Sequence, residues 1–196
     1  GEIDMSEAFA KSCNTYFISL ACKVGADAIY DFACSAGLAG EQTIAGNMTQ
    51  TGSLGALFDI KESASALAHF DIGQGNIMVT PLQVSLLVTS VANGGVYFPP
   101  FLVSGFCGAD GQMKYTKGTE GTRIMSKQTA VLISQMMNRV FEDGTAAESA
   151  PERGFFGGKT ATAETGWTNA DGSLGKNAWF AGFYEFEGER YSVAVL

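Results

Sequence analysis

Two short groups of polar residues lie where segments of regular structure meet, and both contain residue types suited to acid–base or binding chemistry. The first is Ser12-Cys13-Asn14, at a break between two segments with helical periodicity. A serine hydroxyl both donates and accepts hydrogen bonds and can therefore relay a proton, while an asparagine amide can pair with a peptide group in both directions. Serine and asparagine are also common capping residues at helix junctions, so this group alone indicates a cleft only weakly.

The second group is Gly157-Gly158-Lys159-Thr160-Ala161-Thr162, which opens a predicted strand. Glycines before a lysine let another backbone or a ligand approach closely. A lysine with threonines can bind a carboxylate, and an exposed strand edge can pair with an extended peptide. Alternating lysine and threonine also suit any strand that faces solvent. A phosphate-binding P-loop fits poorly, because the G-x-x-x-x-G-K-T spacing is absent and a strand follows instead of a helix.

The elements that must position these groups are helices first and strands last. Helices are predicted over residues 5–11, 15–23, 27–36, 84–93 and 127–141, and a capping box with proline, Thr80-Pro81-Leu82-Gln83, precedes the fourth. Strands are predicted over residues 155–165, 177–186 and 190–196, as an antiparallel meander, and Asp110-Gly111 predicts a hairpin turn. Residues 38–55 show no periodicity and predict an irregular connection. We therefore predict an α+β fold with one domain over residues 1–196, helical at about 5–142 and a β-meander at about 155–196.

The composition excludes several classes of function. The net charge is −8 and the lysines and arginines are scattered, so we do not expect a nucleic-acid partner. The only histidine is His69, and the four cysteines, Cys13, Cys22, Cys34 and Cys107, form no C-x-x-C pair, so we expect neither a metal site nor a cofactor. Buried free thiols are a simpler interpretation of these cysteines than disulfides. No apolar run approaches the ~20 residues of a membrane span.

The two polar groups resemble, in their order, the second and third motifs of penicillin-binding proteins and serine β-lactamases, which run Ser-x-x-Lys, Ser-x-Asn and Lys-Thr-Gly. Further segments are similar to the class B, monofunctional penicillin-binding proteins. They are residues 12–17, Ile72-Gly73-Gln74-Gly75, Val79-Thr80-Pro81-Leu82-Gln83, Ala92-Asn93-Gly94-Gly95, Gly144-Thr145-Ala146 and Ala178-Trp179-Phe180-Ala181-Gly182-Phe183. Each match is weak by itself, but together, in family order, they identify a resemblance to a transpeptidase domain over residues 6–196.

This resemblance implies a fold and a set of roles. The fold is an antiparallel sheet with flanking helices beside a helical subdomain, and the site lies between them. Ser12 would relay a proton, Asn14 would hold the substrate's peptide amide, and Lys159 would supply positive potential for a terminal carboxylate. Thr160 would hydrogen-bond that carboxylate, and the N–H of Thr162 would form half of an oxyanion hole.

The resemblance also implies an activity and its setting. The parent protein would be a peptidoglycan D,D-transpeptidase that cross-links D-Ala-D-Ala stem peptides through an acyl-serine intermediate. Its partners would be the stem peptide, β-lactam antibiotics, and proteins of cell-wall synthesis or division. It would work outside the cytoplasmic membrane, anchored by a helix that is not in this chain.

Two departures from the family pattern limit what the resemblance implies. No Ser-x-x-Lys occurs upstream of Ser12, so we expect the chain to be the C-terminal part of a longer protein, inactive alone and with apolar sheet surface exposed. Ser173-Leu174-Gly175-Lys176 has the same letters but follows the second group, in a strand connection. Ala161, between the two substrate-binding threonines, replaces the motif's glycine and adds a methyl group at the site.

Two other functions remain open from the sequence. The first is a β-lactam sensor domain, which shares the fold and is acylated but turns over poorly, and which the class B matches disfavour. The second is a non-catalytic scaffold in the cell-wall synthesis machinery, for which Ala161 is the only direct support.

Overall fold

The computed structural model of the chain describes residues 2–115, 118 and 120–196. The fold is α+β, with helices in the first part of the chain and the main antiparallel sheet at its end. The helices are α1 (Met5–Ala10), α2 (Asn14–Val24), α3 (Ala26–Ser35), α4 (Leu57–Lys61), α5 (Ala64–Asp71), α6 (Pro81–Ala92), α7 (Lys127–Glu142) and the 3₁₀ helix η1 (Ala147–Ser149). The strands are β1 (Gly40–Ala45), β2 (Met48–Gly52), β3 (Val96–Tyr97), β4 (Gly105–Cys107), β5 (Met113–Tyr115), β6 (Thr122–Arg123), β7 (Phe155–Thr168), β8 (Leu174–Phe186) and β9 (Glu189–Val195).

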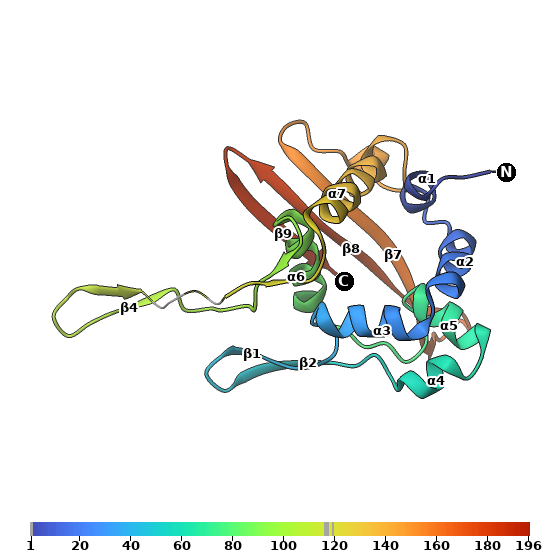
Figure 1. Ribbon diagram of the computed structural model, residues 1–196, viewed down its shortest axis with the longest axis horizontal. Helices are drawn as coiled ribbons and strands as arrows, with labels where there is room; N and C mark the ends of the chain where they lie inside the picture. The colour runs from blue at the N-terminus through green and yellow to red at the C-terminus, as the bar shows by residue number, and fades with distance from the viewer. Residues whose placement is uncertain (1, 116–117, 119) are drawn as a thin grey trace.

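The main sheet has the strand order β7-β8-β9, with every neighbouring pair antiparallel. In Figure 1, α6 and α7 lie across one face of this sheet, and α1 to α5 curve around the end of β7. Lys159 on β7 stands opposite Ala181 on β8, and Ala181 stands opposite Ala194 on β9. The meander expected from the sequence is therefore present, and its register fixes which side chains share a face.

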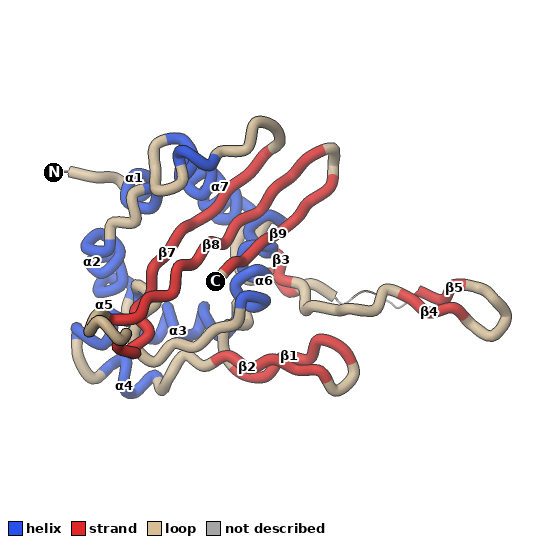
Figure 2. Tube along the Cα trace, turned by 180° about the vertical axis from the view of Figure 1, so that it is seen from behind, coloured by secondary structure: helices blue, strands red, loops and turns tan. Residues whose placement is uncertain are grey.

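One face of the sheet forms the main core, and the other is open apart from a smaller cluster in which Phe156 and Phe180 pack against Phe141. The core cluster joins residues of α6, α7, β8 and the segment between β6 and α7, namely Val88, Val91, Met125, Ala130, Met137, Ala181 and Phe183. Because successive side chains of a strand point to opposite faces, the neighbours of these residues lie on the other side. That face is uncovered in Figure 2 and exposes Tyr191, Val193 and Val195. The expectation of exposed apolar sheet surface is confirmed.

Two adjacent glycines let α7 and the aromatic side chains pack closely on β7. A Cβ atom added at Gly157 would lie 2.8 Å from the Met137 Cβ atom and from the Phe183 ring. A Cβ atom added at Gly158 would lie 2.7 Å from the Phe180 ring. The close approach expected before Lys159 is therefore made by core side chains, and it holds the start of β7 against α7.

The capping box predicted before α6 is confirmed. The Thr80 hydroxyl accepts from the Gln83 N–H at 3.1 Å, and Gln83 Oε1 accepts from the Thr80 N–H at 3.0 Å. Gln83 is fully buried, and its Nε2 also donates to Gly37 O at 3.0 Å. One side chain thus caps α6 and joins it to the turn after α3.

The prediction of an irregular connection over residues 38–55 is wrong. β1 and β2 form an antiparallel hairpin there, with Gln42 opposite Gln50. Gln50 Nε2 donates to Gln42 Oε1 at 2.8 Å, so polar cross-strand pairs stabilise this hairpin where apolar alternation is missing.

The hairpin turn at Asp110-Gly111 is confirmed, because β4 and β5 pair around it. Figure 1 shows β4 and β5 projecting from the body as an arm.

The cysteines are free thiols, as expected, but they are not buried. Cys22, Cys34 and Cys107 are exposed and Cys13 is half-buried, so their burial was predicted wrongly.

Within residues 2–115, 118 and 120–196, no three or more His, Cys, Asp or Glu side chains gather as a metal site would require. In the same part of the chain, no helix combines the length and the hydrophobicity needed to cross a membrane.

Gly157→Ala should lower the free energy of unfolding by about 1–3 kcal/mol, because the added methyl group overpacks the contact between α7 and β7. Urea denaturation of both proteins measures this difference. Gly118→Ala is the matched control, since among the described residues no heavy atom lies within 4 Å of a Cβ atom there. Equal stability of the two variants would show that α7 can move away from β7 at little cost.

Candidate functional site

Ser12 occupies a tight turn between α1 and α2. Its φ angle is +53°, in the left-handed region that residues with a side chain rarely adopt. The Ser12 N–H donates to Phe9 O at 3.2 Å, and the Cys13 N–H donates to Ala8 O at 2.8 Å. This pair of bonds is a Schellman motif, which usually has glycine at the Ser12 position. A serine held there at a conformational cost indicates that its hydroxyl has a use.

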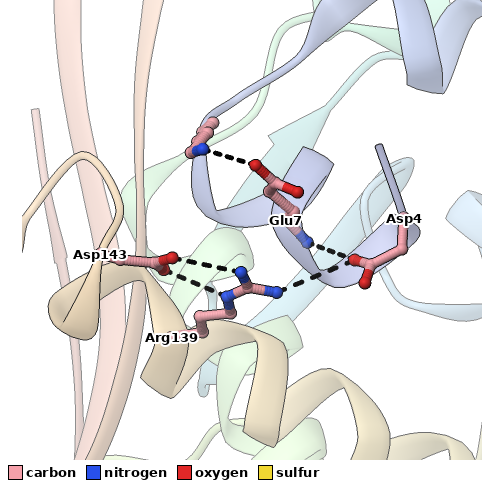
Figure 3. A network of polar contacts seen from close by, with 5 residues as sticks. Asp4, Glu7, Arg139 and Asp143 are labelled. Carbon is pink, nitrogen blue, oxygen red and sulfur yellow. Dashed lines mark hydrogen bonds and ion pairs between the residues drawn. The ribbon is translucent and has the colours of Figure 1, made fainter. Parts of the chain in front are cut away.

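The position of α1, and hence of Ser12, is held by polar contacts to α7. Figure 3 shows the Arg139 guanidinium between two carboxylates. Asp143 lies at the C-terminal end of α7, the helix that carries Arg139, and Asp4 lies just before α1. The guanidinium donates to both Asp143 carboxylate oxygens at 3.1 Å and lies 3.8 Å from Asp4 Oδ1. Asp4 Oδ1 also caps α1 by accepting from the Glu7 N–H at 2.8 Å. Exposed ion pairs contribute little stability, so the main effect of this network is to orient α1.

Lys159 extends from β7 to the Ser12 turn. Its ammonium group donates to Ser12 Oγ and, at 2.5 Å, to Thr160 O. Burial lowers the pKa of Lys159, because a desolvated ammonium loses its hydration. Since Ser12 Oγ accepts from the ammonium, its own O–H stays available as a donor to a third group. The structure therefore brings together a cation and a hydroxyl that can pass a proton onward.

Thr145 makes a second connection between β7 and the end of α1, next to the Ser12 turn. Its hydroxyl lies 2.5 Å from the Thr160 hydroxyl, and its N–H donates to Ala10 O, at the end of α1, at 3.2 Å. A Cβ atom at Gly144 would lie 2.6 Å from that carbonyl oxygen, so the close approach requires glycine. The sequence identified Gly144-Thr145-Ala146 only as a family match, and the Thr145 contacts could not be read from it.

The remaining predicted site residues lie nearby on the surface. Asn14 is the first residue of α2 and is exposed, and among the described residues no hydrogen bond joins it to β7. Thr160 is half-buried, while Ala161 and Thr162 are exposed. The Ala161 methyl group therefore lies at an open position of β7 in the described part of the chain.

Ser173 is not part of this site. It lies in the turn between β7 and β8, where its hydroxyl donates to Asp171 Oδ1 at 2.6 Å. Lys159 pairs with Ala181, eight residues farther along β8, which corresponds to about 25 Å of strand. Ser173 and Lys176 thus lack the helix and the neighbourhood that a nucleophile of this site requires.

The arrangement suits acyl transfer to or from a peptide. A partly buried ammonium and a hydroxyl can move a proton, and a strand edge beside them can hold an extended chain. Threonine hydroxyls next to a cation can bind a carboxylate. These are properties of the described side chains, and they require neither a metal nor a redox group.

Comparison with known proteins gives a consistent result. A family model described as penicillin binding protein transpeptidase domain matches residues 1–196. The chain is 30% identical over 200 residues to the peptidoglycan D,D-transpeptidase PbpA of Mycobacterium tuberculosis, an alignment that covers 99% of this chain and 38% of that protein.

Solved structures show the same fold. An imipenem acyl-enzyme complex of penicillin-binding protein A from M. tuberculosis has a TM-score of 0.83 and 30% identity, over 98% of this chain and 42% of that one. A D,D-transpeptidase domain of a peptidoglycan glycosyltransferase from Eggerthella lenta has a TM-score of 0.84 and 26% identity, over 99% of this chain and 48% of that one. The chain spans less than half the length of each of these proteins.

Lys159→Met should remove a pH dependence of stability at alkaline pH. The pKa of Lys159 is lowered from its ordinary 10.5 in the folded chain, so between the two values the unfolded chain binds more protons. The free energy of unfolding of the unsubstituted chain should therefore rise with pH across that window, relative to the variant. Urea denaturation between pH 7 and 10 measures the difference. The exposed Lys176→Met is the control, and parallel pH profiles for all three proteins would contradict the expectation.

Proposed function

This chain belongs to the family of penicillin-binding protein transpeptidase domains, and from that premise we propose that it is part of a peptidoglycan D,D-transpeptidase. The parent protein cross-links D-Ala-D-Ala stem peptides through an acyl-serine intermediate and is acylated by β-lactams. We place this activity outside the cytoplasmic membrane, where peptidoglycan lies.

The contact between Lys159 and Ser12 is the observation that carries this proposal. It joins the strand with the Lys-Thr motif to the turn with the Ser-x-Asn motif, which come from distant parts of the chain. Acyl transfer by serine needs a group that takes the nucleophile's proton and returns it to the leaving amine. Ser12, with its own O–H free to donate and a cation at its oxygen, has the properties of such a relay.

The reaction follows from these groups. The nucleophilic hydroxyl attacks the carbonyl carbon of the penultimate D-Ala, and its proton passes to a base of the parent protein, because Ser12 Oγ keeps its own proton and accepts from the Lys159 ammonium. The peptide C–N bond breaks, and the terminal D-Ala departs as an amine after taking up one proton through Ser12. The amine of a second stem peptide then attacks the ester, releases the serine and loses one proton by the same route.

The nucleophile itself comes, in this proposal, from a part of the parent protein outside residues 1–196. No Ser-x-x-Lys precedes Ser12 in this chain, and the chain corresponds to 38% of the length of PbpA. Without that serine there is no acyl-enzyme and only half of an oxyanion hole. Residues 1–196 alone are therefore proposed to be inactive.

The other site residues bind the acyl donor. Lys159 and Thr160 hold its terminal carboxylate by charge and hydrogen bonding, and Asn14 holds a peptide amide. The N–H of Thr162 stabilises the oxyanion that forms when the carbonyl is attacked. Ala161 lies on the exposed strand between these two threonines, and its methyl group is accommodated beside the donor.

Exposure of the parent protein, extended upstream to include its Ser-x-x-Lys, to penicillin G should add the mass of one penicillin. Intact-mass spectrometry measures the adduct. Residues 1–196 alone and the extended protein with that serine changed to alanine are the controls, and both should stay unmodified. If the extended protein is folded but forms no adduct, the transpeptidase assignment is refuted and the non-catalytic scaffold is favoured.

Thr145→Val should reduce the efficiency of acylation of the parent protein by penicillin G by about three- to tenfold, the range of one lost hydrogen bond. The cause is that the Thr160 hydroxyl loses the partner that orients it toward the carboxylate. The loss should appear mainly in the binding constant and less in the maximal rate. Thr145→Ser keeps the hydroxyl and should retain most of the efficiency, whereas equal losses in both variants would point to packing alone.

A further inference from the structure

The free edge of β7 is capped by one side chain. β7 pairs with β8 along one edge. Gln74, in the loop between α5 and α6, contacts the other edge. Its Nε2 donates to Thr162 O at 3.4 Å, and its Oε1 accepts from the Glu164 N–H at 3.3 Å. The carboxamide of Gln74 therefore supplies one donor and one acceptor to β7, as a peptide group of a neighbouring strand would.

This cap lies where an acyl donor is proposed to bind. Backbone groups of alternate residues in a strand point to the same edge, so Thr160 and Thr162 share this edge with Glu164. Thr160 O is taken by the Lys159 ammonium. An extended peptide that pairs with β7 from the Thr162 N–H onward reaches Thr162 O and Glu164 N–H next. The Glu164 N–H has one hydrogen and cannot serve Gln74 and a peptide at once.

The backbone of Gln74 is fixed although its side chain can turn. The Gln74 N–H donates to His69 O at 2.8 Å and the Gly73 N–H donates to Phe70 O at 3.0 Å, which closes α5 as a Schellman motif. Gly73, at φ +73°, takes the left-handed position that this motif needs. The side chain reaches β7 through its flexible torsions, and both of its contacts are long and exposed. Such contacts are exchanged for better ones at little cost.

We propose that Gln74 is a displaceable cap on the substrate-pairing edge of β7, and thereby a specificity-determining residue for the acyl donor. In the free protein it occupies Thr162 O and Glu164 N–H. A donor whose own amide pairs with this edge must displace it, while a donor without such an amide does not compete with it. This inference rests on the proposed function, because it assigns a role within the same site.

The test compares two β-lactams on the parent protein. Penicillin G carries an acylamino side chain that can pair with Thr162 O, and imipenem carries a hydroxyethyl group in its place. Gln74→Ala should raise the acylation rate constant of penicillin G by about two- to fivefold, the range of one weak hydrogen bond, and leave that of imipenem within about twofold. Gln135→Ala, which removes the same side chain from an exposed position on α7, should change neither rate.

A second readout needs no β-lactam. The Glu164 amide hydrogen should exchange with solvent faster in Gln74→Ala than in the unsubstituted parent protein, and hydrogen-exchange mass spectrometry of peptides covering residues 160–168 measures this. Unchanged exchange, slower acylation by penicillin G, or equal acceleration of both antibiotics would each overturn the cap. An unsubstituted protein that neither antibiotic acylates would instead refute the proposed function, and the cap with it.

Discussion

The partly buried ammonium of Lys159 sets the conditions that the rest of the site must meet. A cation partly removed from water needs acceptors that replace its lost hydration, and here Ser12 Oγ and Thr160 O do so. Thr160 O is local to the strand, but Ser12 is 147 residues away in the sequence. The contact therefore requires that β7 and the turn after α1 be held in a fixed relation. The left-handed backbone conformation of Ser12 is the local strain that accompanies this fixed relation.

α7 provides that fixed relation, because it packs on both partners. Its middle contacts β7 at Gly157, where only glycine leaves room for Met137. Arg139 orients α1, and the segment after the helix approaches Ala10 and donates from Thr145. α7 contacts β7 and orients α1, and the segment that follows it holds the Thr160 hydroxyl, so the helix and this segment couple all three positions. A displacement of α7 would thus disturb the two motifs together, and interactions of this kind are rarely additive.

The elements with strong local signals were predictable from the sequence, and the contacts between them were not. The capping box at Thr80 and the turn at Asp110-Gly111 are local, and the structure has both. The β1–β2 hairpin was missed because polar pairs such as Gln42 with Gln50 give no apolar period. The family motifs placed Lys159 near Ser12 by resemblance alone. The contacts of Thr145 and Gln74 depend on tertiary packing, so no spacing in the sequence reveals them.

A strand edge that receives a substrate has two opposing requirements. It must present unpaired N–H and C=O groups to an extended peptide, yet the same groups invite pairing with any other exposed strand. A permanent neighbouring strand would satisfy the backbone but block the site. A single carboxamide satisfies part of the edge with two long hydrogen bonds and leaves Thr162 exposed. Because it comes from a loop anchored at α5, it can leave without disturbing any strand pairing. In the role proposed for Gln74, a removable side chain therefore reconciles protection of the edge with access for the donor.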